Sequence, residues 1–297
     1  MSKESRVRYK GTVIRPPSEA QSYILQVTYG CSQNTCTFCP TYLDKSFGVR
    51  PEKEVLDDIE LARNTIPHTR RVFLADGNAL VLSQRRLRTI LHALHSAFPD
   101  LQRVGIYANA RDILKKSGGE LQELCNQKLS ILYIGLESGS DEVLGRVKKG
   151  ATSREMIDAV RKAQAAGIKV SVIGLLGLGG QDLWVEHAEA TGSAVSQMDP
   201  RFLFLLTLMV VPGTELYDEW VGGQFKLPEP IDMLREMRII IENLQGLTGC
   251  IFRTNHASNY LPLAGTLPKD KEKLIHTIDE ALIIGESCLR PEYLRGL

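Results

Sequence analysis

Three cysteines within nine residues constrain this chain more than any other feature of its sequence. Cys31, Cys36 and Cys39 are spaced C-x4-C-x2-C, directly after a strand-like run at residues 23–28. Several thiolates from one short loop are typical ligands of a soft metal ion or an iron–sulfur cluster. Three of them suit a [4Fe–4S] cluster in which one iron is left open to a group other than protein.

Three other kinds of metal protein stay as alternatives. A structural zinc site needs a fourth ligand, usually from a second Cys/His pair, but Cys125, Cys250 and Cys288 are scattered singly. A zinc-dependent hydrolase is disfavoured because the cysteine loop contains neither His nor a carboxylate. A structural or electron-transfer iron–sulfur protein would normally supply four cysteine ligands.

Composition limits the kind of protein further. The chain has 297 residues, 43% hydrophobic and 24% charged, which is ordinary for a globular α/β barrel. A net charge of +1 is too small to attract the whole chain to nucleic acid or to a membrane surface. Residues 1–20 are predicted to be a basic, solvated tail. No apolar signal or membrane-spanning run is evident, so we expect a soluble, cytoplasmic protein without disulfides.

Strand-like and helix-like runs alternate from about residue 22 to residue 220. The predicted strands are 22–28, 71–75, 103–108, 131–135, 169–175 and 202–209. The predicted helices between and after them are 51–64, 83–98, 120–127, 153–166, 182–198 and a short one ending near 220. Six such units predict a parallel sheet with right-handed crossovers, either an open barrel or a doubly wound sheet.

Polar residues gather where these predicted strands end. Asp76-Gly77-Asn78 follows the second strand, Asn109 and Arg111 follow the third, and Glu137-Ser138 follows the fourth. A glycine-rich turn, residues 177–180, follows the fifth. The carboxyl ends of the strands form the rim on which α/β barrels build their active sites, so these loops predict one site.

Over roughly residues 20–220 the sequence resembles the radical S-adenosylmethionine (radical SAM) enzymes. Three features carry the resemblance together: the cysteine loop with Phe38 before its last cysteine, the run 134–141 continuing to Lys149-Gly150, and residues 177–180 with 212–214. The combination is most similar to the subgroup with the Elongator catalytic subunit, oxygen-independent coproporphyrinogen oxidases and methylthiotransferases. The cysteine spacing is one residue longer than the common C-x3-C-x2-C, which lengthens the loop without removing a ligand.

The resemblance implies a partial (β/α)6 TIM-like barrel over residues 21–222 and a mainly helical C-terminal extension over 223–297. It implies that the three cysteines hold a [4Fe–4S] cluster whose fourth iron is chelated by the amino and carboxylate groups of S-adenosylmethionine. The residues that it assigns to S-adenosylmethionine are Asp76, Gly77 and Asn78 for the methionyl amino group, Glu137 for the ribose, Lys149 for the carboxylate, and Phe38, Gly177 and Met209 beside adenine.

The implied reaction is reductive cleavage of S-adenosylmethionine to methionine and a 5′-deoxyadenosyl radical, which abstracts hydrogen from an unidentified substrate. The implied partner is a low-potential electron donor, a flavodoxin or ferredoxin. Two structural alternatives stay open, namely Glu137 as a barrel-rim ion pair and Lys149 as an exposed helix-cap charge.

The polar segment 248–267 is unusually long for a connection inside a compact domain. We predict that it covers the open edge of the barrel and contributes Arg253, His256, Asn259 or Tyr260 to the substrate pocket. His256 and Tyr260 are the candidate catalytic residues. The alternative is that His256 and its neighbours only hydrogen-bond within a folded surface loop.

Overall fold

The computed structural model describes residues 8–296 and divides the chain into two compact units. The first unit contains residues 8–34, 41–133 and 162–169, and the second contains residues 35–40, 134–161 and 170–296. Residues 1–7 of the predicted basic tail lie outside the described residues. The chain crosses between the units inside the cysteine loop, so that loop contributes to both.

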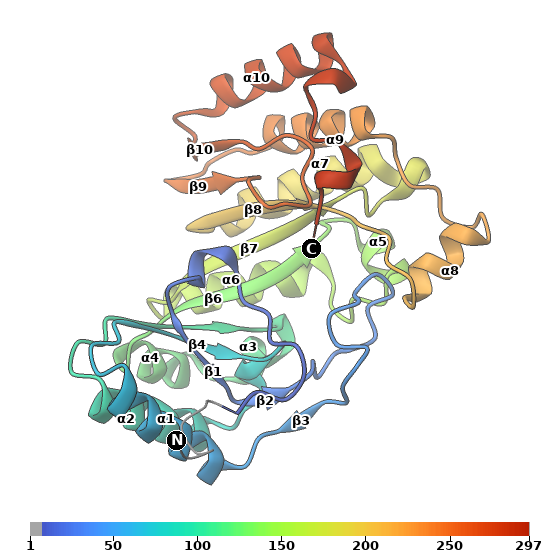
Figure 1. The fold of residues 1–297 in the computed structure, drawn as a ribbon. Coiled ribbons are helices and arrows are strands. Elements are labelled where there is room, and N and C mark those ends of the chain that lie inside the picture. Colours follow the sequence, from blue (N-terminus) through green and yellow to red (C-terminus); the bar gives the residue numbers. More distant parts are fainter. Residues whose placement is uncertain (1–7, 297) are drawn as a thin grey trace. The chain divides into compact units, whose positions relative to one another are not determined.

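The first unit is built on parallel strands in the order β1-β4-β5-β6 (Figure 1). Its strands are β1 (Tyr23–Gln26), β4 (Arg71–Ala75), β5 (Arg103–Tyr107), the first part of β6 (Leu129–Glu137), and the small antiparallel pair β2 (Thr28–Tyr29) and β3 (Gly48–Val49). Its helices are α1 (Glu52–Thr65), α2 (Gln84–Ala97), α3 (Ala110–Lys115) and α4 (Gly118–Asn126), with short 3-10 turns at Pro17–Glu19 and Ala79–Val81.

Helical periodicity explains how α2 covers this sheet. Leu87, Ile90, Leu91 and Leu94 recur at helical spacing and are all fully buried. Ser83 begins the helix, because its hydroxyl accepts a hydrogen bond from the Arg86 N–H. Strand β4 is buried from its second residue onward, as expected for a parallel strand covered on both faces.

The second unit continues the sheet from the end of β6 through β7, β8, β9 and β10. Strands β7 (Lys169–Leu176), β8 (Phe202–Thr207) and β9 (Cys250–Arg253) are parallel, and β10 (Ala264–Leu267) returns antiparallel to β9. The helices are α5 (Asp141–Arg146), α6 (Ser153–Ala165), α7 (Gly180–Met198), α8 (Glu215–Val221), α9 (Pro230–Glu242) and α10 (Lys271–Ile284), with 3-10 turns at Glu286–Cys288 and Glu292–Leu294.

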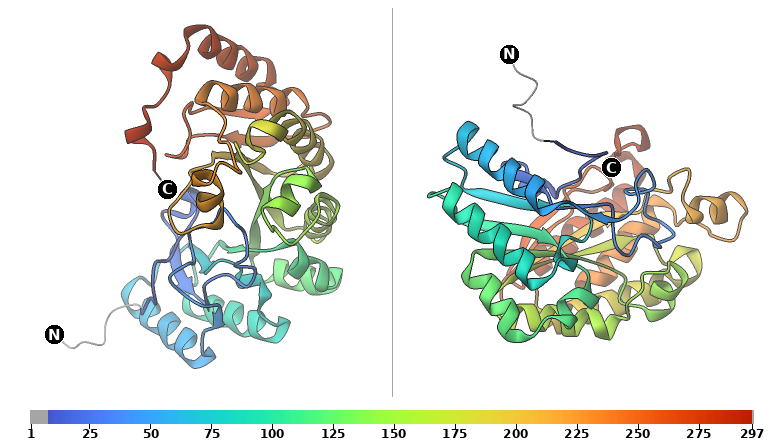
Figure 2. Two further views of the ribbon diagram at one scale, coloured as in Figure 1. Left: turned by 90° about the vertical axis from the view of Figure 1, so that its right-hand side faces the viewer. Right: turned by 90° about the horizontal axis from the view of Figure 1, so that it is seen from below.

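Helix α9 lies between α7 and α10 in the second unit, as Figure 1 and the left view of Figure 2 show. Its Met237, Ile240 and Ile241 are buried. Arg238 on its outer side pairs with Asp279 of α10. A capping box begins α6, because the backbone N–H of Thr152 donates to Glu155 and the Glu155 N–H donates to the Thr152 hydroxyl.

All six predicted strands are present, and the first is divided into β1 and β2. The segment 248–267 differs from its description as a polar connection, because its two ends form β9 and β10 and add to the sheet. Among residues 8–296 the structure has no helix that is both long and apolar enough to span a membrane.

Candidate functional site

The predicted metal ligands all lie in the cysteine loop. Cys31 belongs to the first unit, whereas Cys36 and Cys39 belong to the second, where the Cys39 N–H donates to the Cys36 carbonyl over 3.2 Å. These three described cysteines are partly exposed and form no disulfide. Within the described chain, no three His, Cys, Asp or Glu side chains are close enough to hold a metal ion. The metal assignment therefore rests on the donor chemistry of the loop.

In the second unit the loop is anchored on both sides of Phe38. The Thr37 N–H donates to the Val147 carbonyl after α5 (3.1 Å), and the Thr37 carbonyl accepts from the Leu216 N–H of α8 (2.9 Å). The Phe38 ring packs on a small apolar cluster that includes Leu178 and Leu208. The predicted adenine residues Gly177 and Met209 are the sequence neighbours of these two leucines.

In the first unit Asp76 follows β4 and is fully buried. Its Oδ2 pairs with Lys45 Nζ at 2.6 Å and accepts from Gln26 Nε2 and the Gly30 N–H, both at 3.2 Å. Its Oδ1 is also buried and accepts none of the hydrogen bonds found among the described residues, and the Tyr42 hydroxyl is the donor that lies beside this carboxylate. A buried carboxylate oxygen that accepts no hydrogen bond is costly, so Oδ1 marks a position for a further donor.

Gly77 is required because the backbone after Asp76 passes close to the cysteine loop. A Cβ at Gly77 would come 2.4 Å from the Tyr42 ring and 2.9 Å from Cys31 Cβ. Burial raises the pKa of Tyr42, and the Asp76 carboxylate raises it further, so this phenol stays neutral. The first unit thus presents Asp76 beside the first cysteine through a contact that only glycine permits.

Asn78 is fully committed within the first unit. Its Nδ2 donates to Ser32 Oγ at 2.7 Å and to Asp112 Oδ2 at 2.6 Å, and its Oδ1 accepts from the Asn109 N–H at 3.1 Å. Asn78 therefore braces the cysteine loop against the residues after β5. Of the three residues predicted to receive the methionyl amino group, Asp76 is the one with a side-chain acceptor unused.

In the second unit Glu137 ends β6 and is paired with Lys149, at 2.9 Å between Oε1 and Nζ. Both side chains are only 13% and 12% exposed. A Cβ at Gly135 would overlap Oε1 of Glu137, so the glycine makes room for the pair. Glu137 has φ +63°, a conformation that costs a non-glycine residue on the order of 1–3 kcal/mol and clusters at functional sites.

His256 and Tyr260 lie on the turn between β9 and β10 and both make internal hydrogen bonds. Nδ1 of His256 accepts from the Ser258 N–H at 3.1 Å, and the Ser258 hydroxyl accepts from the Thr207 N–H at the end of β8. The Tyr260 hydroxyl donates to Glu292 at 2.8 Å. Asn259, another predicted pocket residue, bonds Thr207, and Arg253 bonds carbonyls of its own hairpin.

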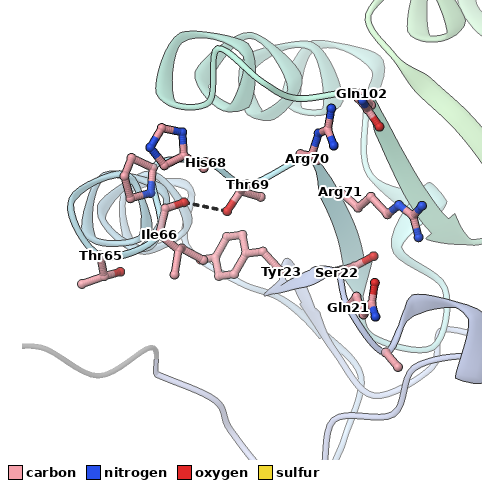
Figure 3. A pocket seen from close by; sticks show the side chains of 12 residues that line it. Gln21, Ser22, Tyr23, Thr65, Ile66, His68, Thr69, Arg70, Arg71 and Gln102 are labelled. Carbon is pink, nitrogen blue, oxygen red and sulfur yellow. Dashed lines mark hydrogen bonds between the residues drawn. The ribbon is translucent and has the colours of Figure 1, made fainter.

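A hollow of about 780 Å³ opens in the first unit at the opposite end of its strands (Figure 3). Its lining includes Tyr23 and Arg71, which begin β1 and β4, and His68 and Gln102. Five residues of strand, about 17 Å, separate the start of β4 from Asp76. This hollow is therefore distinct from the predicted site.

The sequence and the fold of this chain are similar to those of known proteins. The model of the Radical SAM superfamily matches residues 25–190. An uncharacterised methyltransferase of Pyrococcus horikoshii is 26% identical over 213 residues, which cover 69% of this chain and 43% of that protein. The radical S-adenosylmethionine methyltransferase TsrM of Kitasatospora setae is similar in structure, with a TM-score of 0.56 at 20% identity over 68% of this chain and 39% of TsrM.

Coproporphyrinogen III oxidase (HemN) of Escherichia coli shares the fold over 88% of this chain and 69% of its own, with a TM-score of 0.55 at 15% identity. These similarities confirm the partial (β/α)6 TIM-like fold. The chain belongs to the Radical SAM superfamily, a family of enzymes, and its cofactors are a [4Fe–4S] cluster and S-adenosylmethionine. The chain spans less than half the length of the curated relatives that it matches.

The residues present fit these cofactors in three respects. Three thiols stand in one loop, Asp76 keeps a buried acceptor without a partner, and Gly77 leaves the close approach that a Cβ would fill. The sequence did not indicate Lys45, which holds Asp76, or His187 and Glu236, which lie behind the second unit's loops. No motif surrounds these residues, and their partners are distant in sequence.

Proposed function

We propose that this protein cleaves S-adenosylmethionine reductively and uses the resulting radical on an organic substrate. When bound and reduced, the cluster supplies the electron that breaks the C5′–S bond, giving methionine and a 5′-deoxyadenosyl radical that removes a hydrogen atom from the substrate. The observation that carries the proposal is the buried Oδ1 of Asp76, which accepts no hydrogen bond among the described residues.

Each predicted residue takes a role that its chemistry supports. Cys31, Cys36 and Cys39 hold three irons as thiolates. Asp76 accepts from the methionyl ammonium through Oδ1 while Lys45 fixes Oδ2. Gly77 keeps the backbone close to the cysteine loop, and Asn78 keeps that loop in place.

The second unit supplies the remaining contacts in this proposal. Glu137 accepts from the ribose hydroxyls, since a carboxylate has room for several hydrogen bonds beside the one from Lys149. Lys149 offers its positive charge to the methionyl carboxylate. The Phe38 ring and the backbone at Gly177 and Met209 border adenine, which the apolar cluster around Leu178 and Leu208 supports.

The C-terminal extension, residues 223–297, is proposed to cover the substrate. His256 is linked through Ser258 to the Thr207 N–H, two residues before Met209, which supports a position near the end of β8. We include Tyr260 in the same proposal, although its hydroxyl is bound to Glu292. We further propose a low-potential flavodoxin or ferredoxin as the electron donor, because the cluster needs a source of electrons. We propose a cytoplasmic location, because a reduced cluster needs a reducing compartment.

The test is anaerobic reconstitution with iron and sulfide, followed by reduction in the presence of S-adenosylmethionine. We expect one [4Fe–4S] cluster per chain and the formation of 5′-deoxyadenosine and methionine, measured by mass spectrometry. A cluster that forms and is reduced without either product would instead identify an electron-transfer or structural iron–sulfur protein.

Replacing Cys36 with Ala should remove the cluster, because two thiolates are too few to hold it. Iron and sulfide content and the brown absorbance measure this directly. Cys125→Ala is the matched control, since Cys125 lies on α4 outside the loop. A Cys36→Ala protein with full iron and sulfide would show that the loop is not the ligand set.

A further inference from the structure

A chain of fully buried polar side chains lies behind the loops of the second unit. Ser138, His187 and Glu236 are each 0% exposed. Ser138 Oγ and His187 Nδ1 are 2.7 Å apart, and Nε2 of His187 lies 3.1 Å from Oε1 of Glu236, off the ideal line of a hydrogen bond. Both Glu236 oxygens accept from the Gly177 N–H, at 2.9 and 3.1 Å.

These three residues come from elements that are far apart in sequence. Ser138 follows β6, His187 is on α7, and Glu236 is on α9 in the C-terminal extension. Burying an acid and an imidazole away from water costs free energy that apolar side chains would avoid. Hydrogen bonds offset this cost at Nδ1 of His187 and at both Glu236 oxygens, whereas Nε2 of His187 has only its 3.1 Å contact with Glu236 among the described residues.

One end of the chain holds the loop that carries Glu137. Ser138 is the next residue, and its hydroxyl also accepts from the Ser140 N–H at 3.0 Å. The Gly139 N–H donates to Thr191 Oγ1 of α7 at 2.9 Å, and a Cβ at Gly139 would overlap the Ala190 backbone. The loop after β6 is therefore seated on α7, which keeps Glu137 in its left-handed conformation.

The other end holds the turn after β7. Gly177 has φ +85°, and its N–H is taken up by Glu236 instead of by another backbone carbonyl. A Cβ at Gly177 would lie 3.0 Å from Cε of Met233, one turn earlier on the same helix. Helix α9 therefore contacts the Gly177 turn through two side chains on one face.

We propose that Glu236 and His187 are positioning residues for S-adenosylmethionine, and that α9 of the extension thereby belongs to the cofactor site. The inference rests on the proposed function of Glu137 and Gly177. Glu236 fixes the Gly177 turn, His187 transmits the same constraint to Ser138, and neither residue touches the cofactor. Loss of Glu236 frees the Gly177 N–H and releases both loops together.

The test compares Glu236→Ala with Glu236→Gln and with Ile240→Ala in anaerobically reconstituted protein. Ile240 is buried on the same helix, so its replacement matches the loss of packing without touching Gly177. The measurements are the dissociation constant of S-adenosylmethionine, the electron paramagnetic resonance change of the reduced cluster on its addition, the iron content and the melting temperature.

We expect Glu236→Ala to weaken S-adenosylmethionine binding about tenfold and to diminish the spectral change, with iron content unchanged. Glu236→Gln should recover most of the affinity, because an amide oxygen still accepts from Gly177. If Ile240→Ala weakens binding equally at equal loss of melting temperature, the role is only structural and the inference is overturned. Should Glu236→Ala fail to fold, unchanged S-adenosylmethionine binding in His187→Gln overturns it, because His187 would then have no part in holding the loop after β6. Wild-type protein that holds the cluster but does not bind S-adenosylmethionine overturns the proposed function first.

Discussion

In the first unit, a lysine holds the carboxylate that follows strand β4. In the second unit, histidines hold the loops that follow the strands. Asp76 pairs with the ammonium of Lys45 and keeps one oxygen without a partner. In the second unit, His187 bonds Ser138 after β6, and His256 bonds Ser258 beside the end of β8. The Lys45–Asp76 arrangement is thus an ion pair in which one carboxylate oxygen accepts no hydrogen bond from the described residues. The contacts in the second unit are hydrogen bonds between a histidine and a serine, and they hold the backbone of the loops in place.

This difference indicates how the two units divide the work. A residue that touches the cofactor must keep a polar atom for it, as we propose for Asp76, and a buried carboxylate needs a partner of opposite charge. A residue that only positions others can use all of its atoms internally. The comparison therefore predicts that variants in the first unit affect folding and binding together, whereas variants in the second separate the two.

The largest effect is expected from Lys45→Met. The variant leaves the Asp76 carboxylate buried without its counter-ion, and breaking a buried pair in this way costs about 3–5 kcal/mol. Urea denaturation of the cluster-free protein measures the loss. Lys45→Met combined with Asp76→Asn is the control and should regain part of the stability, because no charge is left buried. Equal unfolding free energies for wild type and Lys45→Met would show that the pair does not organise the first unit.

A smaller effect is expected from Glu137→Gln in the second unit. We expect S-adenosylmethionine binding to weaken by about 1–2 kcal/mol, the usual loss for one charge-assisted hydrogen bond. Iron content and melting temperature should barely change, since the amide oxygen introduced by Glu137→Gln can still accept a hydrogen bond from Lys149. Isothermal titration gives the affinity. A large fall in melting temperature with full affinity would mean that the Glu137–Lys149 pair serves the fold alone.

Much of the fold could be predicted from the sequence because local patterns determine it. The helices predicted at residues 83–98 and 153–166 are confirmed as α2 and α6. The polar residues after the strands were found because parallel strands end at one rim. The pairs Lys45–Asp76 and His187–Glu236 could not be predicted, because each joins elements whose approach depends on packing. Strands β9 and β10 were missed because they lie at the two ends of the polar segment 248–267, which was interpreted as a single connection.

The smallest effect is expected from acidification, and it concerns the histidines of the second unit. Burial lowers the pKa of His256, and the positive charge of Arg290 lowers it further. The folded protein thus binds no proton at His256 at a pH where the unfolded chain, with a pKa near 6.5, already does. Stability from this group is complete above about pH 6.5 and falls as the pH drops toward the lower folded value.

We therefore expect the free energy of unfolding to fall between pH 7.5 and pH 5.5, and His256→Gln to remove part of that fall. The neutral Nδ1 accepts from the Ser258 N–H, and protonation would replace this acceptor with a donor. His92→Gln is the matched control, because His92 is exposed on α2 of the first unit. Denaturant titrations at both pH values measure the difference. An identical pH dependence in wild type and His256→Gln would show that the turn near Thr207 is held without the imidazole of His256. The difference between lysine in the first unit and histidine in the second would then have no effect on how stability depends on pH.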